Sequence, residues 1–147
     1  MDHSMYAAEL FLKGYSCSQA ITVAFADVTG LSPEFSAKMA SSFGGGMGRL
    51  REVCGAVSGM FMVAGLLYGY DTPDDDCAKK AHYALVQELA AKFKEQAGSI
   101  VCREILKNPP SDPNPTPRTE EFYKVRYIIC HYPAPLQNLC IYQKTPI

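Results

Sequence analysis

Residues 43–70 read FGGGMGRLREVCGAVSGMFMVAGLLYGY, and this stretch decides the fold. Glycines at 44–46 and 48 lead into residues 53–70, a run that contains no charged side chain. A helical run without charge is typical of a helix that is buried on every side. We therefore expect a glycine-rich central helix over about residues 52–70, with Cys54 in its first turn.

The same run could also cross a membrane, because its length approaches that of a transmembrane helix. Four aspartates within residues 71–76 follow it, however, and glycines recur along it at positions 55, 59, 65 and 69. Such small-residue steps let neighbouring backbones approach closely. We favour a buried core helix and expect no association with a membrane.

The composition indicates a globular protein, with 48% hydrophobic and 20% charged residues and a net charge of −1 over 147 residues. The charges give no sign of a basic surface, so no nucleic-acid partner is expected. The length suits one domain with its own core, so we predict a single helical domain over residues 1–147. The start MDHSMYAAELF lacks the basic and long apolar parts of a secretory signal, which favours the cytoplasm.

Helical periodicity and capping signals divide the remaining chain into further helices. We expect them over residues 4–13, 16–29, 33–42 and 74–96, from 99, and over 119–130. Their apolar faces are predicted to contain Met5, Ala8, Leu12, Cys17, Ala20, Ile21, Ala24, Val28, Cys77, Ala78, Ala81, Leu85, Leu89 and Phe93. The predicted fold is an all-α, compact single-domain bundle of about six to seven helices around the central helix. Residues 131–147 are expected to form an irregular tail.

The glycines at 44–48 do not match a phosphate loop, because no strand precedes them and no lysine follows in the required pattern. No nucleotide cofactor is therefore expected. A tight passage of the backbone between helices explains these glycines better. Arg49 and Arg51 are expected to be surface or loop-bracing charges, although an arginine beside a thiolate would stabilise it.

Six cysteines are many for a cytoplasmic chain of this size: Cys17, Cys54, Cys77, Cys102, Cys130 and Cys140. In a reducing compartment such thiols are more often metal-binding or catalytic than paired in structural disulfides. The absence of C-x-x-C argues against a zinc finger and a thioredoxin-like motif. Three of the six, at 17, 54 and 102, fall in first turns of predicted helices, where unpaired N–H groups stabilise a thiolate. Burial would oppose that effect, and all six could simply be small buried hydrophobes.

Several motifs occur in order along the chain: Gly14–Ala20 (GYSCSQA), Phe43–Arg49 (FGGGMGR), Cys54–Gly59 (CGAVSG), then Cys102 and Cys130. Together they resemble the bacterial C_GCAxxG_C_C family, which is described as redox-active and is named for this pattern. The resemblance covers roughly residues 5–130. A related module occurs in a split-Soret type cytochrome.

The resemblance implies a small helical protein with a redox role, acting through an iron–sulfur cluster or another metal centre. It implies four characteristic cysteines as the cofactor-binding and metal-binding residues, here Cys17, Cys54, Cys102 and Cys130, and leaves Cys77 and Cys140 as extras. No haem is expected, because no C-x-x-C-H is present. In the family the fourth cysteine tends to follow Arg-Pro and to begin a final helix. Here it stands in YIICHYP, a departure that puts the role of Cys130 in question.

Three functions stay open at this point. The chain could be a redox or electron-transfer protein whose cysteines hold a metal ion or an iron–sulfur cluster. It could be a metal-free thiol–disulfide protein, or a non-catalytic helical interaction module with structural buried cysteines. Either redox function implies an unidentified redox partner protein. Whether the chain is an enzyme or a homo-oligomer also stays open, and no hydrolytic triad is visible from which to assign a catalytic residue.

Overall fold

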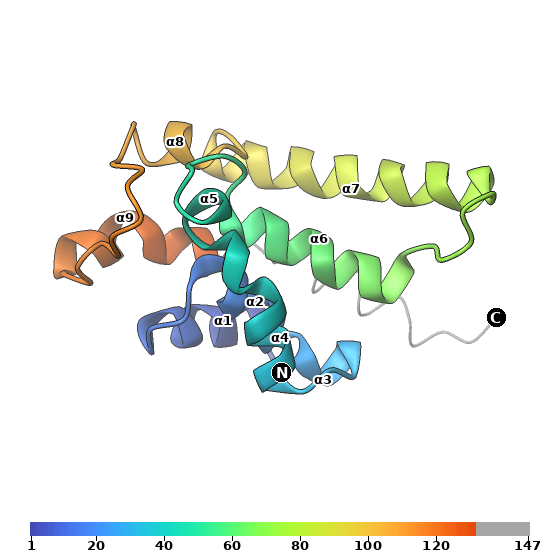
Figure 1. The fold of residues 1–147 in the computed structure, drawn as a ribbon, viewed down its shortest axis with the longest axis horizontal. Helices are drawn as coiled ribbons and strands as arrows, with labels where there is room; N and C mark the ends of the chain where they lie inside the picture. The colour runs from blue at the N-terminus through green and yellow to red at the C-terminus, as the bar shows by residue number, and fades with distance from the viewer. Residues whose placement is uncertain (132–147) are drawn as a thin grey trace.

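The computed structural model describes residues 1–131, apart from the side chains of residues 128, 130 and 131, and this part of the chain is mostly helical. Its helices are α1 (His3–Leu12), α2 (Cys17–Ala24), α3 (Ala26–Thr29), α4 (Pro33–Ala40), the 3-10 helix η1 (Ser41–Phe43), α5 (Gly44–Met47), α6 (Gly55–Tyr68), α7 (Asp76–Ala97), α8 (Cys102–Ile105) and α9 (Glu120–His131) (Figure 1). The prediction of an all-α fold is confirmed. The predicted tail lies outside the described residues, except for residue 131, which ends α9.

Helix α6 is the central helix of the fold, and it spans Gly55–Tyr68 rather than residues 52–70. Val57, Met60 and Val63 on this helix are at most 1% exposed. Helix α2 packs along α6 on one side, and α7 runs beside it on the other (Figure 1). Among the helices within residues 1–131, none is both long enough and apolar enough to cross a membrane.

Local capping signals place several helix starts. Ser16 and Gln19 form the predicted capping box at the start of α2, and Ser32 caps α4 ahead of Pro33. The start of α7 was predicted near residue 74 but lies at Asp76, because the side chain of Asp75 accepts the amide of Ala78 and serves as the cap. These caps satisfy amide groups that would otherwise lack partners in the first turn.

The predicted apolar face of the first helix is wrong in part. Met5 and Leu12 are 57% and 49% exposed, whereas Leu10 and Phe11 are buried. The reason is that α1 packs against both α2 and α9, so its buried surface covers two sides instead of one stripe. In the next segment the predicted single helix is interrupted at Phe25 between α2 and α3, and Val28 beyond that break is 36% exposed.

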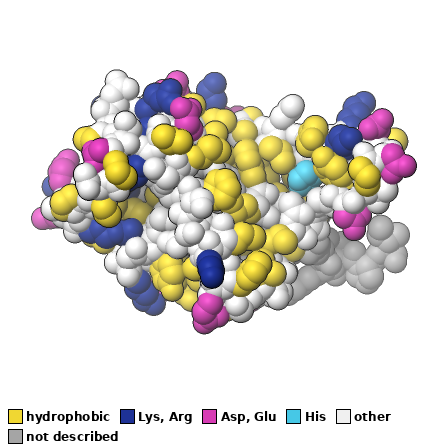
Figure 2. Space-filling view, in the orientation of Figure 1, with side chains coloured by type: hydrophobic (Ala, Val, Ile, Leu, Met, Phe, Trp, Pro, Cys, Tyr) yellow, Lys and Arg dark blue, Asp and Glu magenta, His cyan; other side chains and the backbone are white. Residues whose placement is uncertain are grey.

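The N-terminal half of α7 is more exposed than predicted. Only Leu89 and Phe93 on this helix are buried, while Ala81 and Cys77 are exposed. Figure 1 shows the N-terminal end of α7 reaching past the end of α6, so this half has less of the central helix to pack against. Hydrophobic side chains accordingly reach the surface along these two helices (Figure 2). Leu66 of α6 and Tyr83 of α7 are 48% and 53% exposed. The prediction that Cys77 is a buried hydrophobe is therefore wrong.

Candidate functional site: a cavity lined by cysteines and arginines

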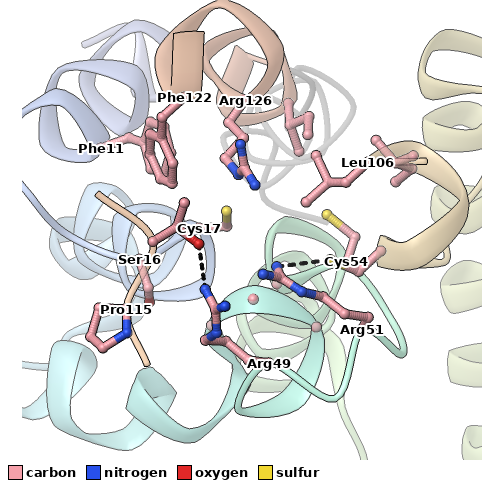
Figure 3. Close-up of a pocket in the computed structure, with 18 of the residues that line it drawn as sticks. Phe11, Ser16, Cys17, Arg49, Arg51, Cys54, Leu106, Pro115, Phe122 and Arg126 are labelled. Atoms are coloured by element: carbon pink, nitrogen blue, oxygen red, sulfur yellow. Dashed lines mark hydrogen bonds between the residues drawn. The ribbon is translucent and has the colours of Figure 1, made fainter. Parts of the chain in front are cut away.

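A cavity of about 350 Å³ opens where the starts of α2, α6 and α8 meet the loops around residues 44–51 and 115–118 and one side of α9 (Figure 3). Three predicted site residues, Cys17, Cys54 and Cys102, line it. Its remaining described lining consists of small and polar residues, four arginines and an apolar wall: Ser16, Ser41, Gly44, Gly45, Gly46, Gly55, Thr116, Arg49, Arg51, Arg118, Arg126, Phe11, Ile105, Leu106, Pro115, Phe122 and Ile129. No aspartate, glutamate or lysine is among these described residues, so the lining is cationic.

Cys17 reaches the cavity as the first residue of α2, directly after the capping Ser16, and it is half-buried. Two glycines allow this close meeting of segments. A Cβ atom at Gly44 would lie 2.7 Å from Cβ of Ser16, and one at Gly55 would lie 3.2 Å from Cβ of Cys17. The prediction that the glycines serve close backbone passage is confirmed at these positions.

Cys54 and Cys102 are neighbours because an antiparallel bridge joins Val53 to Val101. The amide of Cys54 donates to a carbonyl of the opposite segment at 2.8 Å, and the amide of Cys102 does so at 2.6 Å. The extended backbone at Cys54 makes it the residue before α6, not part of its first turn as predicted. This bridge was not predicted; its only local signal is the β-branched valine before each cysteine, a residue type that favours extended backbone.

Burial decides the protonation of the two inner thiols, which are 3% and 5% exposed. It raises the pKa of Cys54 far above the usual range, and the charge of Cys17 adds to the rise. The nearby amides of Ala56 and Val57 lower this pKa, although the side chain of Cys54 makes no capping hydrogen bond. Burial also raises the pKa of Cys102, against an opposing hydrogen bond from Arg51. Both groups are therefore protonated at neutral pH unless a bound cation offsets the cost of their charge.

Arg49 braces the loop that closes one side of the cavity, as predicted. Its Nε donates to the carbonyl oxygen of Asp112 at 2.7 Å, and Nη1 donates to the hydroxyl of Thr116. Its Nη2 lies 3.8 Å from a carboxylate oxygen of the same aspartate. Asp112 and Thr116 belong to residues 108–117, NPPSDPNPTP, whose five prolines predict an extended surface loop. The contacts with Arg49 give this segment a fixed position beside the cysteines.

Arg51 was predicted to be a surface or a loop-bracing charge; at 4% exposed it is no surface charge, but it does brace a loop. Its Nε donates to the carbonyl oxygen of Pro110 at 2.9 Å, and Nη1 donates to Sγ of Cys102 at 3.8 Å. An arginine beside a thiol was the alternative drawn from the sequence. The third nitrogen, Nη2, is buried and has no hydrogen-bond partner within the described part of the chain.

Two further arginines of the lining were not predicted from the sequence. Both terminal nitrogens of Arg118 hold the fold together, since they donate to the carbonyl oxygens of Phe11 and Tyr15 at 2.8 and 2.9 Å. Arg126 reaches in from α9 and stacks on Phe122, with its guanidinium carbon 4.3 Å from the ring centre (Figure 3). The only available signal was their place on either side of the predicted start of the last helix, which says nothing about a distant cavity.

The other cysteines are not among the described residues that line the cavity. Cys77 is exposed on α7, away from the cavity lining. Cys130 belongs to α9, but its side chain lies outside the described atoms, and Cys140 lies outside the described residues altogether. Within the side chains that are described, no three His, Cys, Asp or Glu groups are arranged to hold a single metal ion. The assignment of four cysteines as ligands therefore stays a prediction.

Comparison with known proteins adds one result. A family model described as "Putative redox-active protein (C_GCAxxG_C_C)" matches residues 15–132, which is most of the chain and includes all three cysteines of the cavity. No curated protein and no solved structure matches the chain.

Proposed function

Because the chain belongs to the redox-active C_GCAxxG_C_C family, we propose that it transfers electrons through an iron–sulfur centre in the cavity. The ligands would be Cys17, Cys54, Cys102 and Cys130. Cysteine thiolates are the usual ligands of such clusters. When bound, the cluster would supply reversible one-electron chemistry, which none of the protein side chains in the lining offers by itself.

The observation that carries this proposal is the convergence of three cysteines on one cavity. They come from helices α2 and α8 and from the residue before α6, which lie far apart in the sequence. The fourth cysteine of the family pattern belongs to α9, whose Arg126 and Ile129 line the same cavity. A set of merely structural cysteines would have no reason to share one hollow space.

The charge of the lining supports a centre with several thiolates. A metal core held by four thiolates carries a net negative charge, and a buried negative charge needs cations or hydrogen-bond donors around it. Arg51 supplies a donor at 3.8 Å from Cys102, and Arg126 supplies a second guanidinium group beside the cavity. The core would also offset the burial that keeps Cys54 protonated.

The size of the cavity favours a cluster over a single ion. Its volume of about 350 Å³ is roughly ten times the ~30 Å³ that one water molecule occupies in the liquid. An iron–sulfur cluster contains several iron atoms, so its cysteine ligands would not have to converge on one point.

Anaerobic purification provides the test. We expect iron and acid-labile sulfide, with broad visible absorption, in the full chain and in Cys77→Ser, because that thiol is exposed and away from the cavity. Cys54→Ser should lose most of the iron, since it removes a ligand. Metal analysis and the visible spectrum measure both effects. A folded chain that is colourless and free of metal after anaerobic purification would rule out the proposal.

A metal-free thiol–disulfide function is the second candidate, supported by the position of Cys54 and the more exposed Cys17 in the lining of one cavity. Their two thiols would join in one S–S bond and give two electrons and two protons to a disulfide acceptor. Mild oxidation of the metal-free chain should then remove two titratable thiols, and Cys17→Ser should prevent that loss. A thiol count that oxidation leaves unchanged in the folded chain would reject this candidate and leave a packing role.

A further inference from the structure

One nitrogen of the buried guanidinium group of Arg51 lacks a hydrogen-bond acceptor in the described part of the chain. Nε and Nη1 are used by the carbonyl oxygen of Pro110 and the thiol of Cys102, but Nη2 has no partner within residues 1–131. Leaving a buried charged donor unpaired is costly, and each such group calls for an explanation. Because Arg51 lines the cavity, a ligand there would supply the missing acceptor.

Arg126 offers a second positive charge to the same space. It is half-buried, stacks on Phe122 and makes no ion pair with the described carboxylates. Burial lowers its pKa, and the nearby charge of Arg51 lowers it further. Figure 3 shows both side chains pointing into the cavity from opposite elements, the loop before α6 and helix α9. Two guanidinium groups that face each other without an acid between them repel, and an anion between them removes that repulsion.

One wall of the cavity is apolar. Ile105 and Leu106 of the α8 region, together with Phe122 and Ile129 of α9, form part of the lining beside the two arginines. The volume of about 350 Å³ falls at the lower end of the range for small-molecule sites, about 300–1,000 Å³. A bare inorganic ion would leave this apolar surface uncovered, whereas a small organic molecule would cover it.

We propose that the cavity binds a small organic anion. Its negatively charged group lies between Nη2 of Arg51 and the guanidinium group of Arg126, and its apolar body rests on Leu106 and its neighbours. A planar guanidinium group presents paired donors that match the oxygens of a carboxylate. The inference goes beyond electron transfer: Nη1 of Arg51 serves the thiol of Cys102, while Nη2 serves the anion.

The test is calorimetric titration of the full chain, as isolated, with benzoate, benzamide and inorganic phosphate as probes. We expect benzoate to bind at least about tenfold more tightly than benzamide, which has the same ring without the charge. Phosphate should bind more weakly than benzoate, because it leaves the apolar wall uncovered. Metal content measured on the same sample separates this result from the proposed centre, since either can fail while the other holds.

Variants on one helix provide the control. Arg126→Gln should weaken benzoate binding about tenfold or more, and Arg126→Lys should retain part of the affinity. Lys124→Gln removes the same charge from an exposed position of α9 and should leave the affinity unchanged. A melting curve of each variant checks that it is folded. The proposal would be overturned if benzoate did not bind, or if it bound no more tightly than benzamide or less tightly than phosphate. Equal losses of affinity in the variants at 124 and 126 would also overturn it.

Discussion

Replacing Gly46 by alanine is expected to lower the free energy of unfolding by about 3 kcal/mol. The residue is buried and has a φ of +77°, where an L-amino acid pays roughly 1–2 kcal/mol. A Cβ atom there would also lie 2.6 Å from Cβ of Cys102 and 2.9 Å from Cα of Arg51. Since one of these contacts is with backbone, relief requires the loop to move, and overpacking of this kind costs about 1–3 kcal/mol. Urea unfolding of the purified chain measures the loss.

Gly30→Ala is the matched control for that substitution. Gly30 has almost the same backbone angle, +75°, but no atom lies within 4 Å of the position that a Cβ would take. It should therefore lose only the conformational part, roughly 1–2 kcal/mol. The difference between the two variants isolates the contact with Cys102 and Arg51. Equal losses at both positions would show that the loop does not pack against the cysteine as described.

The helical framework could be predicted because its signals are local. The cap at Ser16 needs only Gln19 three residues later, and the buried character of α6 follows from a long run without charge. The errors occur where a second element decides the outcome. Met5 and Leu12 are exposed because α1 contacts two helices at once, and Cys77 is exposed because α7 extends past α6. The hydrophobic periodicity of a single helix indicates neither how many helices it contacts nor how far it extends past a neighbour.

The cavity could be predicted only in part, for the same physical reason. The family pattern places Cys17, Cys54 and Cys102 in one set, but the meeting of the last two depends on a bridge between segments almost fifty residues apart in the chain. Arg51 and Arg126 belong to different segments, and nothing in either segment predicts that the other approaches. Their place in one cavity lining is a product of tertiary packing, which has no local signal.

Gly59→Ala is expected to destabilise the fold by about 1–2 kcal/mol, because α2 crosses α6 at this glycine. A Cβ atom at Gly59 would lie 2.9 Å from Cβ of Ile21 and 2.9 Å from the carbonyl oxygen of Ser18. The two helices would have to separate, at a cost of about 1–3 kcal/mol, which exceeds the gain of roughly 0.5–1 kcal/mol from replacing glycine in a helix. Because Cys17 begins α2, any separation also moves a thiol of the cavity.

Gly65→Ala on the same helix should have the opposite sign. No atom outside the helix lies within 4 Å of the position of its Cβ. Only the gain in helix propensity then remains, and the free energy of unfolding should rise by about 0.5–1 kcal/mol. Chemical denaturation of both variants and the parent chain, with equal slopes, measures the two shifts. If Gly59→Ala stabilises the chain as Gly65→Ala does, then α2 is not packed against α6 at this glycine. The close approach that brings Cys17 to the cavity would then need another explanation.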